Sequence, residues 1–284
     1  EADEFDRSFL QLHPSAIILT SMDPDHLDIY GDASELIKSF EDFSKRVKSN
    51  GKLFVKNGLP IKGITYGIED NSDYAIQNIK IENGTYVFDV KTPKTVLENL
   101  HFNLPGRHNL SNALIALAMA VEYGCPHQQL AKALASYKGV KRRFTYHIKT
   151  ENLVFIDDYA HHPEEINAVH QAIREMYPRK KVLAIFQPHL YSRTRDFVDD
   201  FAKSLSQFDE VLLLDIYPAR ELPIEGVSSS WLLEKINNKN KQLVSKKDLL
   251  SQIHKSAAQI ILTIGAGDIG EEAKYIKKEF SVAS

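Results

Sequence analysis

Short apolar runs followed by polar residues recur along the second half of the chain and predict buried strands that end in loops. These runs cover residues 153–157, 182–186, 211–216 and 260–264. Segments with apolar residues at helical spacing follow them, at residues 163–176, 195–206, 231–237 and 269–280. Strands that alternate with helices are typical of a parallel sheet covered on both faces. We therefore expect a doubly wound α/β domain in this half.

The first half of the chain has a different pattern. Residues 15–20 form one more apolar run that predicts a strand, and residues 31–50 place apolar side chains at helical spacing. From residue 52 to residue 104 the segments are short and alternating, and Asn83-Gly84 between two of them predicts an antiparallel hairpin. Residues 110–123 predict an apolar helix, and Pro126 begins another helix that ends near Gly139.

We place a domain boundary near Gly139, where the pattern of the chain changes. Residues 1–139 then form an α/β domain that contains the hairpin, and residues 140–284 form the doubly wound domain. The chain has 284 residues, of which 43% are hydrophobic, so each domain is large enough to bury its own core.

Composition excludes several classes of protein. Lys and Arg number 35 against 38 Asp and Glu, so no global basic field favours nucleic acid. The longest apolar run, residues 113–121, is too short to span a membrane. A single cysteine, Cys125, excludes an internal disulfide framework and fits a reducing compartment. No secretory signal pattern is visible, and because the first methionine is Met22 we expect a fragment of a longer protein.

Two clusters in the first domain combine polar groups that suit ligands. Residues 1–4 and 23–28 gather carboxylates and one imidazole, His26, which could bind a divalent metal, although a solvated acidic loop explains them more simply. Asn109 and Asn112 are three residues apart at a helix start, so both amides lie on one face. Such amides suit the edge of an adenine, but ordinary helix capping is the simpler reading on local grounds.

In the second domain, three polar clusters follow predicted strands, where open α/β sheets bind their ligands. Residues 157–163 (DDYAHHP) contain two acids, a tyrosine and two histidines, more than a turn needs. Arg193 and Arg195 lie in the next cluster and could grip a carboxylate. Residues 264–268 (IGAGD) contain a G-x-G before a helix, which is weak evidence because close packing of strand and helix explains it equally well.

The boundary segment itself carries adjacent guanidiniums. Arg142 and Arg143 could clamp phosphate oxygens, or they could form an ordinary solvated linker. No G-x-x-x-x-G-K-[ST] string occurs in the 284 residues, so the chain contains no P-loop of its own.

Taken together, these strings resemble the Mur ligase family of peptidoglycan synthesis. The matching segments are, in chain order, EADEFDRSFL, DPDHLD, PGRHNLSNA, KRRF, DDYAHHPEEI, FQPHLYSRTRD, IEGVSS and GAGDI. They cover nearly the whole chain, and DDYAHHP, FQPH and GRHNxxNA in combination are highly specific. The arginine loop favours the branch that adds L-alanine over the branch that recycles murein tripeptide.

The resemblance implies a cytoplasmic ligase that uses ATP and Mg²⁺ to join L-alanine to UDP-N-acetylmuramate through an acyl phosphate. It implies only small-molecule substrates, with no nucleic acid and no membrane insertion. Family members have a UDP-sugar domain, a central ATPase domain with a P-loop, and a Rossmann-like last domain. By this comparison the chain lacks the first domain and the P-loop half of the second, so we expect it to be inactive alone.

Residue roles in the first domain follow from the same resemblance. Glu1 and His26 match the ligands of the second magnesium ion, and His26 would thereby act in catalysis. Asn109 and Asn112 match the pair that contacts adenine. Ser21 replaces a common asparagine before the metal loop, which puts the hydrogen bonding of that loop in doubt.

In the second domain the resemblance assigns both nucleotide and amino-acid contacts. Arg143 matches the catalytic arginine that reaches the ATP phosphates, and Asp158 matches the acid that holds the ribose hydroxyls. Tyr159, His161 and Arg193 match the pocket for L-alanine. A second pocket arginine common in the family is replaced by leucine at position 190, so the carboxylate could be held differently.

Two other functions stay open. A metal-dependent phosphohydrolase would also use acid and histidine clusters, but no H-x-H or H-x-x-x-H pair stands beside another cluster. A non-catalytic nucleotide-binding module is compatible with the absence of a P-loop.

Overall fold

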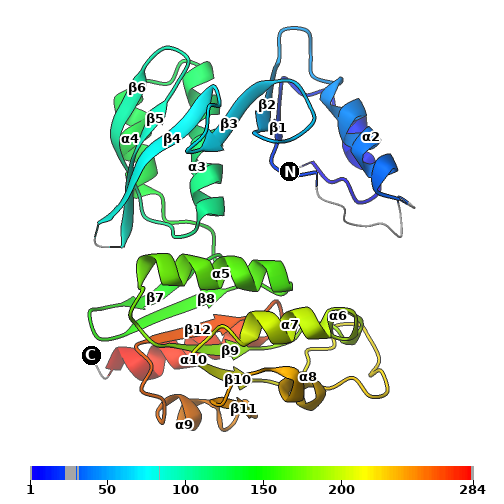
Figure 1. The fold of residues 1–284 in the computed structure, drawn as a ribbon, viewed down its shortest axis with the longest axis vertical. Helices are drawn as coiled ribbons and strands as arrows, with labels where there is room; N and C mark the ends of the chain where they lie inside the picture. Colours follow the sequence, from blue (N-terminus) through cyan, green and yellow to red (C-terminus); the bar gives the residue numbers. More distant parts are fainter. Residues whose placement is uncertain (1, 23–29, 31, 83, 283–284) are drawn as a thin grey trace. The chain divides into compact units, whose positions relative to one another are not determined.

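The structure is a computed structural model that describes residues 2–22, 30, 32–82 and 84–282 (Figure 1). The chain divides into two compact units. Unit 1 comprises residues 1–103 and 108–137, and unit 2 comprises residues 104–107 and 138–284. Each unit is built around its own six-stranded sheet.

The sheet of unit 1 is mixed, with strand order β1-β2-β3-β4-β5-β6. β1 (Ala16–Leu19), β2 (Lys52–Lys56), β3 (Ile64–Ile68) and β4 (Tyr74–Glu82) are parallel to one another, whereas β5 (Thr85–Lys91) and β6 (Val96–Phe102) continue the sheet as an antiparallel meander. The predicted hairpin is confirmed by the pairing of β4 with β5, while Asn83 lies outside the described residues.

The described helices of unit 1 are η1 (Ser8–Gln11), α2 (Ala33–Ser44), α3 (Arg107–Glu122) and α4 (His127–Ser136). α2 begins after Asp32, whose carboxylate accepts hydrogen bonds from two N–H groups of the first turn. Phe43 of α2 packs with Ile17, Leu19 and Val55 of β1 and β2. The helix predicted at residues 31–50 is shorter than expected, because the chain turns after Ser44.

The sheet of unit 2 has the strand order β11-β10-β9-β12-β8-β7. Its strands are β7 (Thr145–Lys149), β8 (Val154–Asp158), β9 (Val182–Phe186), β10 (Glu210–Leu213), β11 (Lys241–Leu243) and β12 (Ile260–Ile264). Neighbouring strands are parallel except at one edge, where β7 pairs antiparallel with β8. The four strands predicted in this half are confirmed, and the two edge strands β7 and β11 are additional.

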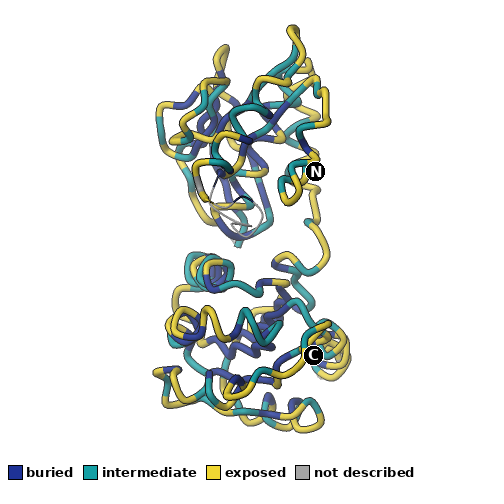
Figure 2. The backbone as a smooth tube through the Cα atoms, turned by 90° about the vertical axis from the view of Figure 1, so that its right-hand side faces the viewer, coloured by how far each residue is buried: buried dark blue, intermediate teal, exposed yellow. Residues whose placement is uncertain are grey.

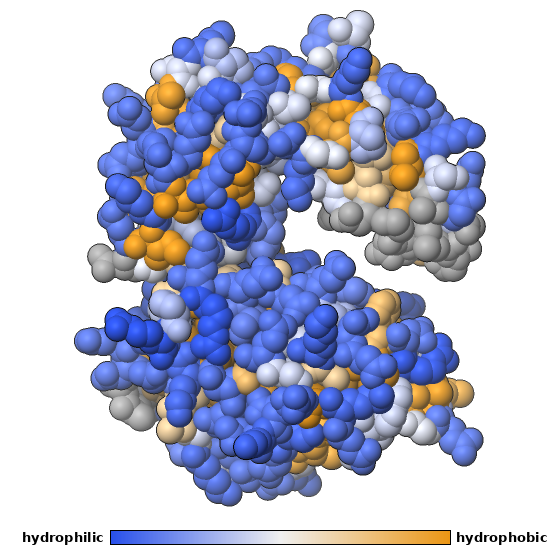
Figure 3. All heavy atoms as spheres, in the orientation of Figure 1, coloured by the Kyte–Doolittle hydropathy of each residue, from blue (hydrophilic) through white to orange (hydrophobic). Residues whose placement is uncertain are grey.

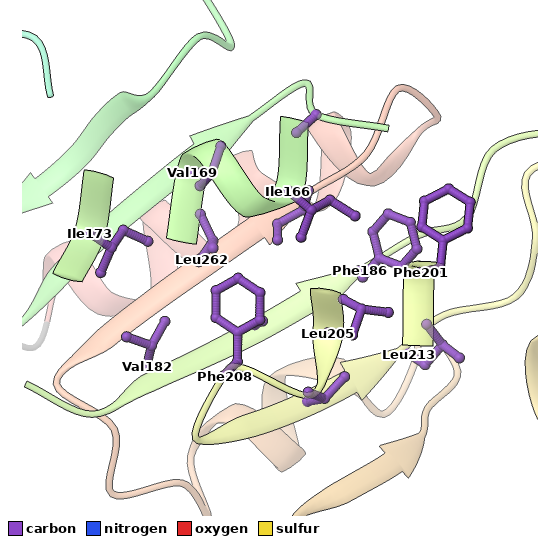
Figure 4. Close-up of a cluster of buried hydrophobic side chains, with 14 of the residues drawn as sticks. Ile166, Val169, Ile173, Val182, Phe186, Phe201, Leu205, Phe208, Leu213 and Leu262 are labelled. Carbon is purple, nitrogen blue, oxygen red and sulfur yellow. The ribbon is translucent and has the colours of Figure 1, made fainter. Parts of the chain in front are cut away.

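Helices cover both faces of the unit 2 sheet and confirm the doubly wound fold. They are α5 (Pro163–Met176), α6 (Tyr191–Asp196), α7 (Val198–Leu205), α8 (Ser229–Lys235), α9 (Leu249–Ile253) and α10 (Ile269–Val282). On one face Ile166 of α5 and Phe201 of α7 belong to the same apolar cluster as Phe186 of β9 (Figure 4). On the other face Ile185 packs with Ile276 of α10. The helix expected at residues 195–206 is two helices, α6 and α7, that meet at a single residue.

Because helices enclose this sheet, its central strands are buried from end to end (Figure 2). On the face drawn in Figure 3, hydrophilic side chains cover most of unit 2, whereas unit 1 shows several hydrophobic patches. Val96, Tyr123 and Tyr137 are exposed large hydrophobic residues of unit 1. Within the described ranges, no helix combines the length and the apolar character that a membrane span requires.

Candidate active site

Polar side chains gather at the carboxyl ends of the central strands of unit 2. Asp157 and Asp158 end β8, Gln187 follows β9, and Asp268 lies in the loop after β12. These three strands are adjacent and parallel, so their carboxyl ends lie along one edge of the sheet. This is the edge at which open α/β sheets bind ligands.

The carboxyl group of Asp158 is buried and bonded to the backbone on both sides. Oδ2 accepts a hydrogen bond from the N–H of Phe144 at 2.7 Å, and Oδ1 accepts one from the N–H of Ala160 at 2.8 Å. Burial raises the pKa of Asp158 to about 6. The side chain therefore holds Phe144, which has a left-handed φ of 48°, against the end of β8. Each oxygen keeps a second lone pair for a ligand.

The preceding acid, Asp157, has a different set of partners. Its Oδ2 accepts a hydrogen bond from Nε of Arg142 at 3.0 Å, and its Oδ1 accepts one from the hydroxyl of Thr263 at 2.8 Å. Arg142 also donates from Nη2 to the carbonyl oxygen of Gly265 at 2.6 Å. Asp157 and Arg142 thus form a buried ion pair that connects β8 with β12 and with the loop after it.

The two adjacent arginines of the boundary segment are therefore not equivalent. The guanidinium of Arg142 is committed to partners within unit 2, whereas the Arg143 side chain is 55% exposed and lies 3.6 Å from a carboxylate oxygen of Glu165. The idea that both guanidiniums clamp phosphate is not supported by this arrangement. Arg143 is the member of the pair that a ligand can reach.

A row of aromatic rings crosses the loops that follow β8, β9 and β10. Tyr159 meets His161 edge to face at 5.4 Å, His161 meets His189 at 6.0 Å, and His189 stacks on Tyr217 at 5.7 Å. Nδ1 of His161 lies 3.0 Å from the carbonyl oxygen of Tyr159 and 3.2 Å from Glu165. The sequence-predicted Tyr159 and His161 therefore lie together, with their rings in contact.

The imidazole of His189 is unusual because its Nδ1 is buried and has no hydrogen-bond partner among the described residues. Burial lowers the pKa of His189, and the charges of His161 and Arg193 lower it further. The ring is therefore neutral at pH 7. A polar atom left in this state costs stability unless a ligand or water bonds it.

Arg193 is the candidate carboxylate-binding group of this edge. It lies in α6, is half-buried, and forms no ion pair with any residue that the structure describes. Arg195, which the sequence offered as a second candidate, is exposed and pairs with its neighbour Asp196 at 2.7 Å. Between the two guanidiniums, only that of Arg193 has its charge available for a substrate.

The candidates in unit 1 are arranged differently. Asn109 and Asn112 both lie in the early turns of α3, where Asn112 is exposed and Asn109 is half-buried. Glu1 and His26, the predicted magnesium ligands, lie outside the described residues. Within the residues that the structure does describe, no group of three His, Cys, Asp or Glu side chains could hold a metal ion.

Two residues of the unit 2 edge had no assigned role in the sequence. Gln187 is buried, donates from Nε2 to Asp268 at 2.7 Å, and accepts from the N–H of Ile269 at 2.9 Å, which fixes the loop before α10. Glu165 accepts the N–H of His161 at 2.8 Å and lies beside Arg143. Their positions could have indicated a role, because Gln187 directly follows a strand and Glu165 lies in the first turn of the next helix. The sequence could not reveal their partners, which are distant in the chain or lie in loops whose conformation the sequence does not predict.

Sequence profiles of known families match both units. The Mur ligase middle domain matches residues 3–120, and the glutamate ligase domain of the Mur ligases matches residues 142–274. Together these two matches cover most of the chain, which therefore belongs to the Mur ligase family. The resemblance stated from the sequence motifs is confirmed.

Relatives named UDP-N-acetylmuramate–L-alanine ligase are similar along almost the entire chain. The protein of Christiangramia forsetii is 66% identical over 278 residues, which cover 98% of this chain and 62% of the relative. That of Flavobacterium psychrophilum is 64% identical over 279 residues, with the same coverage. The chain therefore spans about three fifths of the length of these relatives.

Solved structures of the family have the same fold. The UDP-N-acetylmuramate-alanine ligase of Thermotoga maritima superposes with a TM-score of 0.81 at 25% identity, over 100% of this chain and 64% of that one. A MurF structure from Acinetobacter baumannii superposes with a TM-score of 0.72 at 16% identity, over 96% and 62% of the two chains, and shows the shared fold alone.

Proposed function

We propose that this chain is part of an ADP-forming ligase that joins L-alanine to UDP-N-acetylmuramate in the synthesis of peptidoglycan precursors. The observation that carries the proposal is the 66% identity to a ligase of that name over 98% of the chain. In this reaction ATP converts the muramate carboxylate into an acyl phosphate, and the amine of L-alanine then displaces the phosphate. We place the activity in the cytoplasm, where ATP is supplied.

The amino-acid pocket would lie at the carboxyl edge of unit 2. A guanidinium binds a carboxylate through two parallel hydrogen bonds, and Arg193 has this capacity to spare because it forms no ion pair with a described residue. The contacting rings of Tyr159 and His161 would form a wall of the pocket. Leu190 offers no charge, so in this proposal Arg193 holds the alanine carboxylate without a second arginine.

The resemblance assigns four residues to ATP. Asn109 and Asn112 would hydrogen-bond the adenine, and Arg143 would act in catalysis by stabilising charge on the phosphate oxygens. Asp158 would accept hydrogen bonds from the ribose hydroxyls with its remaining lone pairs. Phosphoryl transfer also needs a cradle of backbone amides and a lysine, which no P-loop string in the 284 residues supplies, so we expect the chain alone to be inactive.

Mg²⁺ would neutralise charge on the transferring phosphate when bound. We assign its binding to Glu1 and His26, whose hard oxygen and imidazole ligands suit this cation. The described residues do not add a further metal-binding group, and the roles proposed for the other side chains do not depend on the metal. We also propose a domain boundary near Gly139, with domains at residues 1–139 and 140–284. This boundary is supported by the division of the chain, because Tyr137 is the last residue of unit 1 and the segment from Lys138 onward belongs to unit 2.

The test is ADP formation by the full-length enzyme that carries this chain. We expect ADP release only when ATP, Mg²⁺, UDP-N-acetylmuramate and L-alanine are all present, with one amide formed for each ADP. Phosphate release with Mn²⁺ from simple phosphate esters, independent of L-alanine, would instead indicate a phosphohydrolase. Nucleotide binding without turnover under every substrate combination would indicate a binding module. Either outcome would overturn the proposed function.

A further inference from the structure

Arg142 joins three loops at the carboxyl edge of the unit 2 sheet. Its Nε donates to Asp157 at 3.0 Å, its Nη2 donates to the carbonyl oxygen of Gly265 at 2.6 Å, and its Nη1 lies 3.5 Å from the carbonyl oxygen of Gly267. The same guanidinium lies over the ring of Tyr159, with Cζ 5.1 Å from the ring centroid. One side chain therefore connects the boundary segment, the end of β8 and the loop after β12.

The backbone of Arg142 is fixed as firmly as its side chain. The residue has a left-handed φ of 60°. Its N–H donates to the hydroxyl of Thr145 at 2.8 Å, and its carbonyl oxygen accepts the N–H of Tyr159 at 2.8 Å. Both ends of the side chain are thus anchored, so the guanidinium has one defined position over the aromatic ring.

The ion pair with Asp157 and the bonds to backbone carbonyls would serve folding alone. The contact with Tyr159 is different, because this side chain is 37% exposed and contributes little to the core. Its ring touches that of His161, and its carbonyl oxygen is 3.0 Å from Nδ1 of His161. Arg142, whose side chain is mostly covered, therefore contacts the ring that in turn contacts His161.

We propose that Arg142 is a positioning residue for the amino-acid pocket, and that the neighbouring Arg143 serves the nucleotide instead. The guanidinium of Arg142 holds the Tyr159 ring in place, and the ring in turn holds His161. This inference rests on the proposed function, which assigns Tyr159 and His161 to the binding of L-alanine.

The first experiment replaces Arg142 by lysine in the full-length enzyme. An ammonium cannot reproduce a planar fork that meets a carboxylate, a carbonyl and a ring at once. We expect Arg142→Lys to raise the KM for L-alanine about tenfold while kcat and the KM for ATP change by less than about twofold. The matched comparison is Arg143→Lys, which should lower kcat and raise the KM for ATP but leave the KM for L-alanine within about twofold.

A second variant moves the guanidinium without removing it. A Cβ at Gly270 would lie 2.8 Å from Cζ and 2.9 Å from Nε and Nη1 of Arg142, so in Gly270→Ala the guanidinium must shift. Alanine is a better helix former than glycine, so the first turn of α10 is not weakened by this change. We expect the KM for L-alanine to rise severalfold with little change in Tm. In the Arg142→Lys background the same change should have a much smaller effect.

The outcomes separate the two proposals. An active enzyme in which both variants keep the wild-type KM for L-alanine overturns the role of Arg142. If the variants have a lower Tm, or yield a smaller amount of active enzyme, but keep the wild-type KM for L-alanine, Arg142 only stabilises the fold. This result also overturns the positioning role of Arg142. A wild-type enzyme that makes no amide from L-alanine removes the proposed function before any variant is measured, and the positioning role is then rejected with it.

Discussion

The two units place their polar networks at opposite ends of their parallel strands. In unit 1, Lys52 and Tyr74 are the first residues of β2 and β4, and both bind Glu122, the last residue of α3. In unit 2, Asp157 and Asp158 are the last two residues of β8. Both networks join a strand to distant segments, yet they lie at the amino end of one sheet and at the carboxyl end of the other.

The two networks also differ in whether all of their polar groups are paired. In unit 1, Glu122 accepts a hydrogen bond from the Tyr74 hydroxyl at 2.6 Å and pairs with Lys52, so each group has its partner. At the unit 2 edge, Arg193 forms no ion pair with a described residue, and Nδ1 of His189 is buried without a hydrogen-bond partner in the described chain. Polar groups with spare capacity at the carboxyl ends of strands are those expected to bind a ligand.

The largest expected effect is a pH dependence of the stability of unit 2. Burial raises the pKa of Asp158 to about 6, above the ordinary value of 3.8. The folded state then favours the neutral carboxyl, so the contribution of Asp158 is fully present below about pH 4 and is lost as the pH rises through 6. A difference of this size corresponds to up to about 3 kcal/mol in the free energy of unfolding.

Asp158→Asn provides the matched comparison because an amide does not titrate. The variant loses one acceptor facing a backbone N–H, so we expect it to be less stable than wild type at pH 4. The difference in the free energy of unfolding between wild type and Asp158→Asn should decrease as the pH rises to 7. Denaturant unfolding at several pH values measures it, with fluorescence of Trp231, the single tryptophan, as a probe placed in unit 2. A difference that increases with pH would show that the backbone hydrogen bonds, which lower the pKa of Asp158, have a larger effect than burial, which raises it.

The next largest effect concerns Arg193 in the full-length enzyme. Arg193→Lys should raise the KM for L-alanine by about tenfold to a hundredfold, because a point charge replaces a bidentate fork. The control is Arg195→Lys, since Arg195 is exposed and already paired with Asp196. That change should alter the KM for L-alanine by less than about twofold. Equal effects of the two substitutions on the KM for L-alanine would mean that the absence of an ion pair at Arg193 does not identify the amino-acid pocket.

The sequence predicted the elements of unit 2 where the pattern was strong. β8, β9 and β12 are buried along their whole length, so each produced an uninterrupted apolar run, and α5 carries its apolar residues at regular helical spacing. β7 and β11 were not predicted because they lie at the edges of the sheet and are only partly buried. The division between α6 and α7 at Phe197 was also missed, since no glycine or proline marks it.

The candidate site was predictable in place but not in its contacts. Residues after strand ends could be singled out because parallel strands bring their carboxyl ends together. The two acids at positions 157 and 158 look alike in the sequence, yet one pairs with Arg142 and the other with backbone N–H groups. Such pairs join segments far apart in the chain, as Arg142 and Gly265 do, and no local pattern encodes them. The ligand roles of these residues stay predictions.

In unit 1 we expect a smaller pH dependence of stability, with a sign opposite to that of Asp158. The hydrogen bond from Lys52 and the one from Tyr74 lower the pKa of Glu122, so its contribution to stability is present above the ordinary value of 4.5 and is lost as the pH falls through the folded pKa. Glu122→Gln should lower the stability of unit 1 by about 1 kcal/mol at pH 7 and by less at pH 3. Amide hydrogen exchange in β2 and β4 measures this locally. An undiminished loss at pH 3 would exclude the charge as its cause.

The smallest expected effect tests whether unit 1 contributes a ligand contact away from its structural network. Asn112 is exposed on α3, three residues after Asn109, so its amide can be removed without disturbing the core. Asn112→Ala in the full-length enzyme should weaken ATP binding by about threefold to tenfold, the value of one or two hydrogen bonds. Inorganic tripolyphosphate has no base, so its affinity should stay the same and serves as the control. If both ligands weaken equally, Asn112 acts through the fold of α3 and the adenine contact is rejected. If neither weakens, the exposed amide is a solvated helix residue and the nucleotide base is bound elsewhere.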